Sequence, residues 1–277
     1  MAFTSYMSGT IEVFERPGQK HAPVVMLLHG IGSNASSFDL ILAHLPDDWR
    51  VIAWNAPGYG CSEPLRDVWP VAADYAHALL GLYDRLGLSD PVLVGHSLGT
   101  LIGASFAAKH PDRIARLMLA SPALGHGVTV GESLSTAAQN RIDDLERLGA
   151  SDFAKARAAR LVANADQNVD VVARVCKGMS QVQNPGYSQA VHMLASGRLL
   201  EDAAKISCVT NVLVGADDVV TPPASAIQTH EMLAASIQGD LTQLPAVGHA
   251  IYQQFPTGFA RALHDLVAPI TCQPEEG

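Results

Sequence analysis

The sequence predicts an α/β fold in which helices flank a mostly parallel central sheet, and three observations lead to this prediction. The chain has 277 residues, of which 48% are hydrophobic and 16% charged, enough for the core of one large globular domain. Short apolar runs without polar alternation, such as Val92-Leu93-Val94, are typical of strands buried on both faces. These runs alternate with segments of helical periodicity, as in sheets whose parallel strands are joined by crossover helices.

The first part of the chain contains five strand-like runs and three helix-like segments. Residues 10–14 alternate polar and apolar side chains, which is typical of a strand. Residues 71–86 carry apolar side chains at helical spacing, and Gly87 follows in the usual position for a helix end. Strands are expected at residues 10–14, 24–28, 50–54, 92–94 and 114–120, and helices at residues 36–45, 71–86 and 101–109.

The character of the sequence changes between residue 123 and about residue 205. No strand-like run occurs there, and residues 149–151 (Gly-Ala-Ser) and 184–186 (Asn-Pro-Gly) interrupt the helical pattern. We interpret this segment as a helical cap inserted after the sixth strand of the sheet. Ordinary sheet-covering helices are the alternative, and the absence of strand-like runs between the segments argues against it. Helices are expected at residues 134–148, 152–165, 169–182 and 187–200.

The strand pattern resumes after the cap and completes the same sheet. Strands are expected at residues 208–214 and 240–244, and helices at residues 224–235 and 255–267. The predicted organisation is a first part of the core at residues 1–122, the cap at 123–205, a second part of the core at 206–268 and a disordered tail at 269–277.

Composition and charge argue against several classes of function. The net charge of −9 argues against a nucleic-acid partner, which needs a basic face. The four cysteines are scattered without zinc-binding spacing, and no phosphate-binding or dinucleotide-binding glycine motif is present. We therefore expect no metal and no cofactor. The chain starts without a basic and apolar leader and its apolar runs are too short to span a bilayer, so a cytoplasmic location without a membrane partner is expected.

The stretch Gly95-His96-Ser97-Leu98-Gly99 carries the main chemical signal of the sequence. It follows an apolar strand and precedes a run rich in Ala and Leu, which is typical of a helix. A serine at the apex of such a turn needs small neighbours, because the backbone is strained and the strand and helix pass close together. The turn would lift the Ser97 hydroxyl above the sheet and place the Leu98 N–H at a helix N-terminus. A plain turn whose serine caps the helix is the alternative.

A serine hydroxyl is a weak nucleophile and needs a base in hydrogen-bond contact, and a carboxylate must hold that base in the correct tautomer. Histidine suits the role of base because imidazole titrates near neutral pH. His249 follows Gly248 after the last predicted strand, and Asp217 and Asp218 follow the strand before it. The sequence therefore offers Ser97 as nucleophile, His249 as base and two candidate acids. A surface loop histidine is the alternative for His249.

The chain resembles the α/β-hydrolase fold superfamily in five stretches that occur in order, each just after a predicted strand. The resemblance covers nearly the whole chain, with the cap as its least specific part. It implies the α/β-hydrolase fold and a serine hydrolase. The five stretches are His29-Gly30-Ile31-Gly32, Gly58-Tyr59-Gly60-Cys61-Ser62, Gly95-His96-Ser97-Leu98-Gly99, Gly215-Ala216-Asp217-Asp218-Val219-Val220-Thr221-Pro222 and Gly248-His249.

The resemblance also implies roles for single residues. Its Gly-X-X-Asp-X-X-X-Pro pattern places the acid at Asp218, with Pro222 in register. Some related hydrolases carry the acid after the strand that ends here at residue 120, and residues 121–124 offer no carboxylate. The backbone N–H groups of Ile31 and Leu98 are expected to form the oxyanion hole. His29 and His96 are expected to be structural, with His96 supporting the turn from behind, and the candidate substrate contacts are Ser33, Phe38, His126 and His192.

Single positions narrow the choice among branches of the superfamily. Ser97 argues against the haloalkane dehalogenases and epoxide hydrolases, which use aspartate at that position. The carbon–carbon bond hydrolases of aromatic degradation usually have Asn before the serine and Trp after the histidine. This chain has His96 and Ala250 there, so that branch is disfavoured.

Three stretches are similar to those of 3-oxoadipate enol-lactonases, namely residues 29–34, 184–187 and 218–223. Asn55 and Thr100 depart from the lactonase pattern, which commonly has an acid at the first position and glycine at the second. The resemblance therefore implies a lactone or a small carboxylate ester as substrate without fixing which one.

These observations predict a serine-dependent hydrolase that cleaves a small ester or lactone through a Ser97–His249–Asp218 triad and an acyl-enzyme. Three other classes stay open. They are another triad enzyme (carbon–carbon bond hydrolase, acyltransferase or lyase), a cofactor-free oxygenase and a non-catalytic ligand-binding receptor. An anionic substrate would need a cation in the cap, although helix-face solvation is the alternative role. The candidate cations are Arg141, Arg157, Arg160, Arg174 and Arg198.

Overall fold

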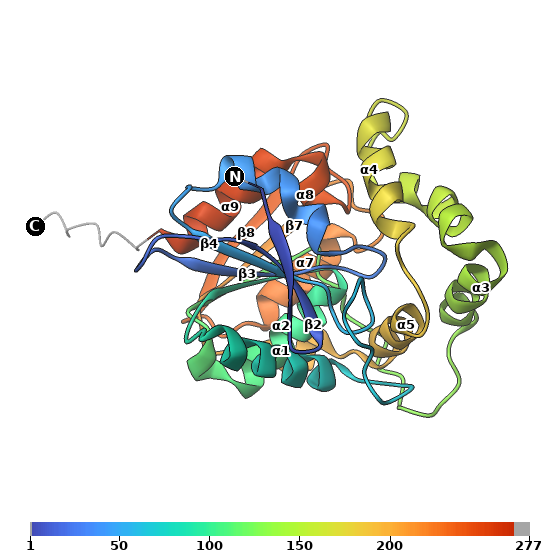
Figure 1. The fold of residues 1–277 in the computed structure, drawn as a ribbon, viewed down its shortest axis with the longest axis horizontal. Coiled ribbons are helices and arrows are strands. Elements are labelled where there is room, and N and C mark those ends of the chain that lie inside the picture. Colours follow the sequence, from blue (N-terminus) through green and yellow to red (C-terminus); the bar gives the residue numbers. More distant parts are fainter. Residues whose placement is uncertain (1, 269–277) are drawn as a thin grey trace, which may run out of the picture.

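The computed structural model describes residues 2–268 and contains an eight-stranded sheet with helices on both faces (Figure 1). The strand order is β1-β2-β4-β3-β5-β6-β7-β8. The expected disordered tail at residues 269–277 lies outside the described residues. The strands are β1 Thr4–Ser8, β2 Ile11–Arg16, β3 Val24–Leu28, β4 Arg50–Trp54, β5 Val92–His96, β6 Arg116–Ala120, β7 Thr210–Gly215 and β8 Gln238–Leu244.

The sheet is parallel from β4 to β8, and this gathers the carboxyl ends of those strands at one edge. Only β2 pairs antiparallel, with β1 and with β4. Leu28 of β3 lies opposite Gly95 of β5, and His96 lies opposite Ala120 of β6. The loops that follow these three strands therefore start side by side, which is where active groups gather in open parallel sheets.

Two apolar layers enclose the sheet, one on each face. Leu93 of β5 belongs to the layer that contains the helix α2 Leu98–Lys109, whereas its neighbour Val94 belongs to the layer that contains the helix α9 Pro256–Val267. Both faces of the strand are thus buried, which explains its lack of polar alternation. The first layer contains α1 Ala72–Leu86, α2 Leu98–Lys109 and α7 Pro223–Met232, and the second contains the 3₁₀ helix η1 Ala35–His44, α8 Ile251–Gln254 and α9 Pro256–Val267. A short 3₁₀ turn, η2 Pro111–Arg113, leads into β6.

Helices without intervening strands form the cap between β6 and β7, as the sequence predicts (Figure 1). Gly149 interrupts the helix α3 Thr136–Arg157 with φ +72°, at the predicted break. The predicted helix at residues 187–200 is divided at Gly197, and its second part, α6 Leu199–Ala203, packs against α2 and α7 in the core. The other helices are α3 Thr136–Arg157, the 3₁₀ helix η3 Ala158–Leu161, α4 Val169–Met179 and α5 Gly186–Ser196.

The edge strand β1 is absent from the predicted elements. Most of its side chains are exposed, so it carries no apolar pattern, and it forms because its backbone pairs with β2, from Thr4 opposite Glu15 to Ser8 opposite Ile11. With β1 counted, β6 is the sixth strand, as expected for the strand before the cap. The predicted helix at residues 36–45 is a 3₁₀ helix.

Candidate active site

Ser97 lies at the turn between β5 and α2 with φ 52° and ψ −116°, a backbone conformation that non-glycine residues rarely adopt. Its N–H donates to Ala120 O at 2.9 Å, which holds the turn against β6. A Cβ at Gly95 would lie 2.4 Å from Gly99 O, and a Cβ at Gly99 would lie 2.4 Å from Leu28 O. The close approach of backbone to backbone therefore requires both glycines of the motif.

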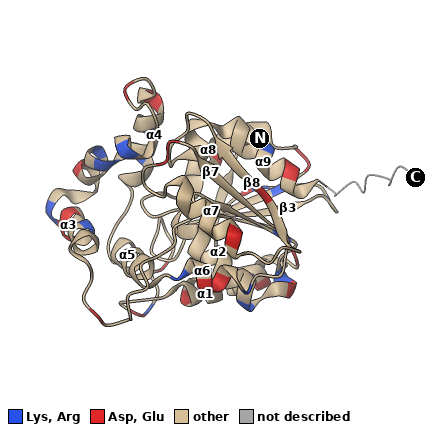
Figure 2. Ribbon diagram, turned by 180° about the vertical axis from the view of Figure 1, so that it is seen from behind, with Lys and Arg blue, Asp and Glu red and all other residues tan. Residues whose placement is uncertain are grey.

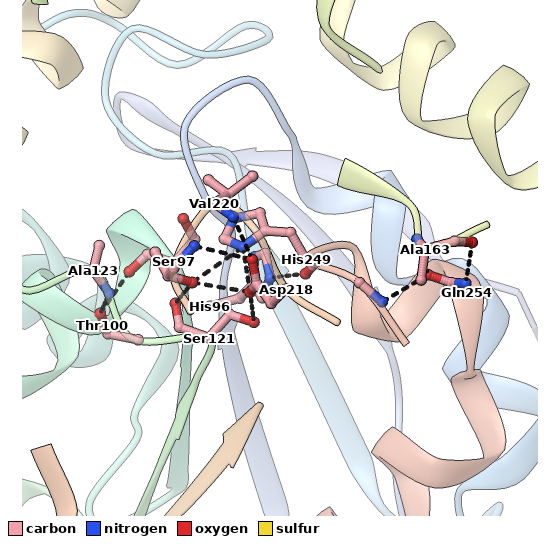
Figure 3. A network of polar contacts seen from close by, with 12 residues as sticks. His96, Ser97, Thr100, Ser121, Ala123, Ala163, Asp218, Val220, His249 and Gln254 are labelled. Carbon is pink, nitrogen blue, oxygen red and sulfur yellow. Dashed lines mark hydrogen bonds and ion pairs between the residues drawn. The ribbon is translucent and has the colours of Figure 1, made fainter. Parts of the chain in front are cut away.

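His249 and Asp218 lie beside the Ser97 turn, in the loops after β8 and β7 (Figure 3). His249 Nδ1 is 2.8 Å from Asp218 Oδ2, and both side chains are buried. Because an ionised carboxylate only accepts hydrogen bonds, the imidazole carries a proton on Nδ1 and leaves Nε2 as the basic nitrogen. Asp217, the other candidate acid, is exposed. The structure thus brings Asp218, and not Asp217, to His249.

The Asp218 carboxylate accepts four further hydrogen bonds. Val220 N–H and Thr221 N–H donate to Oδ1 at 2.8 and 2.9 Å. The hydroxyls of Ser121 and Thr221 donate to Oδ2 at 2.9 and 3.0 Å. Burial by itself would raise the pKa of Asp218, but His249 and the two N–H donors outweigh it and lower the pKa to about 2. Asp218 is therefore ionised at neutral pH.

Ser121 and Thr221 belong to the site, although sequence reasoning gave neither of them a role. Ser121 follows β6 with φ +47°, and its carbonyl lies 3.1 Å from Thr221 Oγ1. Thr221 Oγ1 is also 3.2 Å from His249 Nδ1. Two signals were present in the sequence: residue 121 follows the strand where related hydrolases carry an acid, and Thr221 lies within a matched motif.

Two buried histidines hold the loops of the site from behind. His96 Nε2–H donates to His249 O at 2.8 Å, and burial, assisted by the neighbouring His249, lowers the pKa of His96 to about 3. His29 Nδ1–H donates to Gly30 O at 2.9 Å, and its Nε2 accepts from Ala56 N–H at 3.0 Å. Burial lowers the pKa of His29 to about 4. Both rings are neutral at neutral pH, consistent with the structural roles predicted for them.

The two expected oxyanion donors lie beside the nucleophile. Ile31 and Leu98 line the same cavity as Ser97, and neither backbone N–H donates to a protein acceptor within residues 2–268. Leu98 is the first residue of α2, where backbone N–H groups lack acceptors within the helix. A Cβ at Gly30 would lie 2.9 Å from Ser97 Cβ, so glycine lets this loop approach the nucleophile. The arrangement suits stabilisation of an oxyanion.

A cavity of about 370 Å³ is lined by Ser97 and His249 on the core side and by residues of the cap. Its volume is in the range typical of small-molecule sites. Apolar side chains form part of its walls, with Leu124, Met179 and Leu194 among them. The polar or charged residues contributed by the segment between β6 and β7 are His126, Arg141, Arg157, Arg160 and Tyr187.

The four residues predicted to contact substrate occupy different places. His126 lines the cavity, whereas Ser33 Oγ bonds Tyr252 Oη at 2.9 Å and lines a smaller adjoining cavity. Phe38 is wholly buried in the core, where it packs on the Tyr252 ring with centroids 4.3 Å apart. His192 packs on Trp69 with ring centroids 4.5 Å apart. Phe38 and His192 are absent from the cavity lining. The ring of Phe38 is packed in the core, and the ring of His192 on α5 is packed against Trp69.

No metal site is evident in the described part of the chain. Residues 2–268 contain no group of three or more His, Cys, Asp or Glu side chains placed to hold a metal ion. Within the same residues, no helix is both long and apolar enough to cross a membrane. The described groups of the site are the Ser97 hydroxyl, the His249 imidazole bonded to the Asp218 carboxylate, and the backbone N–H groups of Ile31 and Leu98.

Comparison with known sequences identifies the family. Residues 23–270 match the family described as alpha/beta hydrolase fold. The chain is 25% identical to 3-oxoadipate enol-lactonase 2 of Acinetobacter baylyi over 245 residues, which is 84% of this chain and 89% of that protein. It is 27% identical to the pimeloyl-(acyl-carrier protein) methyl ester esterase of Neisseria meningitidis over 249 residues, which is 88% of this chain and 92% of that protein.

Solved structures share the architecture. The enol-lactonase from Burkholderia xenovorans is similar with a TM-score of 0.80 at 22% identity, covering 95% of this chain and 99% of that one. A thermophilic esterase from Thermogutta terrifontis gives a TM-score of 0.79 at 24% identity, covering 96% of each chain. These likenesses confirm the predicted fold.

Proposed function

The chain belongs to the α/β hydrolase fold family, and from that premise we propose that it is a serine-dependent hydrolase of small carboxylic esters or lactones. Ser97 is the nucleophile, His249 the general base and acid, and Asp218 the residue that orients and stabilises His249. The backbone N–H groups of Ile31 and Leu98 form the oxyanion hole. No cofactor or metal takes part in this proposal.

In the first half-reaction, Ser97 Oγ attacks the carbonyl carbon while His249 Nε2 takes the hydroxyl proton. The carbonyl oxygen becomes an oxyanion, which the Ile31 and Leu98 N–H groups stabilise. The tetrahedral intermediate then collapses with cleavage of the bond between the acyl carbon and the leaving oxygen. His249 gives its proton to that oxygen, and the acyl group stays on Ser97. In a lactone the released hydroxyl remains part of the acyl chain.

In the second half-reaction, a water molecule gives a proton to His249 Nε2 and attacks the acyl carbon. The same oxyanion hole stabilises the second tetrahedral intermediate. The bond to Ser97 Oγ breaks, and His249 returns the proton to Ser97. The product is a carboxylic acid, and the enzyme is regenerated.

The observation that carries the proposal is the contact of His249 Nδ1 with Asp218 Oδ2 at 2.8 Å beside the strained Ser97 turn. This contact fixes the tautomer that a general base needs, and the pKa of about 2 keeps Asp218 ionised to receive the imidazolium charge. The names of the two relatives support the reaction class, since one is a lactonase and the other a methyl ester esterase.

Labelling with a fluorophosphonate probe, followed by mass mapping, tests the proposal. We expect the probe to modify Ser97 and to block turnover in a panel of short esters and lactones. Ser97→Ala is expected to lose the label and to reduce turnover by about 10⁴-fold or more, with an unchanged circular dichroism spectrum. An unlabelled wild-type protein, or an active Ser97→Ala variant, would exclude this mechanism.

The same preparation separates the other classes. An added alcohol that appears as a new ester in the products indicates an acyltransferase, and carbon–carbon cleavage products indicate a carbon–carbon bond hydrolase or lyase. Oxygen uptake with substrate indicates an oxygenase. Labelling of Ser97 in single turnover without any steady state indicates a receptor.

A further inference from the structure

The cavity carries positive charge in a protein whose net charge is −9. Arg141, Arg157 and Arg160 line it, and no Asp or Glu of the described residues does so. Arg174 and Arg198, which the sequence offered equally, lie outside the lining. Figure 2 shows the blue of Lys and Arg along α3 and the segment that leads from it to α4. Of the five candidate cap arginines, Arg141, Arg157 and Arg160 are therefore placed to contact a molecule in the cavity.

Arg157 is already paired with a protein carboxylate. Its Nη2 donates to Asp144 Oδ2 at 2.9 Å, and its guanidinium carbon lies 4.7 Å from the centre of the Phe153 ring. These contacts hold its side chain in place, although Asp144 also accepts from the exposed Arg147 at 2.8 Å and so is shared by two arginines. Arg160 is exposed, so water and salt screen its charge. Arg157 therefore has a carboxylate partner, and the charge of Arg160 is solvated.

Among the residues that the structure describes, Arg141 is the half-buried arginine of the cavity lining that lacks a carboxylate partner. Among residues 2–268, no carboxylate lies within 4.0 Å of its guanidinium. Its polar neighbour is the Tyr187 hydroxyl: burial raises the pKa of Tyr187, and the nearby Arg141 and Arg157 charges oppose that rise. A neutral phenol does not balance a guanidinium, and a cation withdrawn from water is unfavourable unless an anion pairs with it.

We propose that Arg141 binds a carboxylate group of the substrate, so that the enzyme acts on esters or lactones that carry a free carboxylate apart from the carbonyl that reacts. This inference rests on the proposed function. It assigns Arg141 the role of a specificity-determining residue.

The Arg141 guanidinium suits a carboxylate group in both charge and shape. Arg157 and Arg147 share Asp144, so Arg141 is the half-buried arginine of the lining without a carboxylate partner among the described residues, and a carboxylate supplies one negative charge for it. A guanidinium also matches the planar fork of a carboxylate with two parallel hydrogen bonds. The apolar walls formed by Leu124, Met179 and Leu194 suit a hydrocarbon spacer between the carboxylate and the reacting carbonyl.

Matched pairs of methyl esters test this inference. The pairs are monomethyl succinate with methyl butanoate, monomethyl glutarate with methyl pentanoate, and monomethyl adipate with methyl hexanoate, assayed at pH 7 where the free carboxyl is ionised. The quantity compared is the ratio of kcat/KM within a pair. In the wild type we expect this ratio to favour the half-ester by about 10- to 100-fold for at least one spacer length, the range of a charge-assisted hydrogen bond.

Variants assign the preference to one side chain. Arg141→Gln is expected to bring the ratio close to one, because kcat/KM for the half-ester falls much more than kcat/KM for the neutral ester. Arg174→Gln, which removes an exposed arginine of α4 outside the cavity, is expected to keep the wild-type ratio. Tyr187→Phe is expected to keep a preference for the half-ester, because it removes a neutral neighbour and leaves the charge. A wild-type ratio near one for every pair, or an Arg141→Gln variant with the wild-type ratio, would overturn the inference.

Protection from labelling gives a second readout that needs no turnover. Glutarate is expected to slow fluorophosphonate labelling of Ser97 in the wild type and not in Arg141→Gln, with pentanamide as the uncharged control. Equal protection in both proteins, or none in either, would contradict the role of Arg141. A failure of the proposed function looks different, because Ser97 would then remain unlabelled with no competitor present.

Discussion

The hydroxyl of Ser121 donates to Oδ2 of Asp218 at 2.9 Å, although 97 positions separate the two residues in the chain. Ser121 directly follows β6, and Asp218 follows β7, which pairs with β6 through Ala120 opposite Leu213. The carboxylate is thus fixed from two adjacent strand ends. A site built this way depends on the register of the sheet as much as on its own residues.

Removal of the Thr221 hydroxyl is expected to slow the reaction while the fold is kept. Thr221→Val loses an oxygen that lies 3.0 Å from Asp218 Oδ2 and 3.2 Å from His249 Nδ1. We expect kcat/KM to fall about 10-fold, mainly through kcat, since a hydrogen bond to a charged group is worth roughly 1.5–3 kcal/mol. Thr221→Ser keeps the hydroxyl and is expected to recover most of the loss. Equal losses in both variants would show that the hydroxyl alone does not restore the reaction and would contradict the role given to it.

The ionisation of Asp218 is expected to contribute to stability in a defined pH window. Its pKa is about 2 in the folded protein against 3.8 for an ordinary aspartate, so below about pH 4 the unfolded chain binds a proton that the folded chain does not. The contribution is present above about pH 4 and is lost as the pH falls toward 2. Urea unfolding should show the wild type losing about 2 kcal/mol more than Asp218→Asn between pH 5 and pH 2. Parallel curves for the two proteins would contradict the lowered pKa.

The burial of His96 is expected to destabilise the protein in mild acid. The lowered pKa, about 3, means that between pH 6.5 and 3 the unfolded chain binds a proton that the folded chain does not. Stability from this source is complete above pH 6.5 and falls as the pH falls. His96→Gln retains a donor for His249 O without an imidazole to titrate. Its unfolding free energy should lose up to about 1.4 kcal/mol less per pH unit across this window than that of the wild type.

His29 titrates in nearly the same window, because burial lowers its pKa to about 4. The His96→Gln variant should therefore keep part of the acid sensitivity. A slope identical to that of the wild type would show that His96 is not the neutral buried group described above.

A methyl group at residue 30 is expected to disturb catalysis more than folding. The Cβ of Gly30→Ala would lie 2.9 Å from Ser97 Cβ, so the loop that carries Ile31 must move away from the nucleophile. Loss of one oxyanion donor typically lowers kcat by about 10²- to 10³-fold, and partial displacement should give about 10-fold or more. Steady-state kinetics and thermal melting of the same samples separate the two effects.

Gly81→Ala is the matched control, because a Cβ there, on the α1 helix, would meet only the end of the Arg85 side chain at 3.4 Å. We expect it to keep wild-type kinetics and to gain up to about 1 kcal/mol of stability from the higher helix propensity of alanine. An active Gly30→Ala variant with unchanged kcat would refute the tight fit of this loop.

Local patterns were sufficient for most of the core. Apolar runs without alternation predicted the central strands, because a strand buried on both faces has no solvent-facing positions that would carry polar residues. The edge strand β1 escaped prediction for the opposite reason, since its side chains are mostly exposed and its order comes from pairing with β2. The single helix predicted at residues 187–200 divides at Gly197, because its end packs against α2 in the core.

The sequence by itself determined the α/β fold, the Ser97 turn and the candidate base His249. These features depend on short-range physics: periodicity of burial, small residues where backbones meet, and chemistry that needs a particular side chain just after a strand. Even so, the pattern alone left Asp217 beside Asp218 as a candidate acid until a family resemblance favoured Asp218.

Only the tertiary structure decided which residues share one space. The register of the strands places Ser121 beside Asp218, and the core encloses Phe38. The packing of the cap helices places Arg141 in the cavity lining and leaves Arg174 outside it. Such outcomes depend on contacts between segments far apart in the chain, whose free energy is set by burial and partner geometry. A local sequence pattern does not contain that geometry. Residues of the same type, such as Arg141 and Arg174, therefore cannot be told apart as cavity residues before the chain is folded.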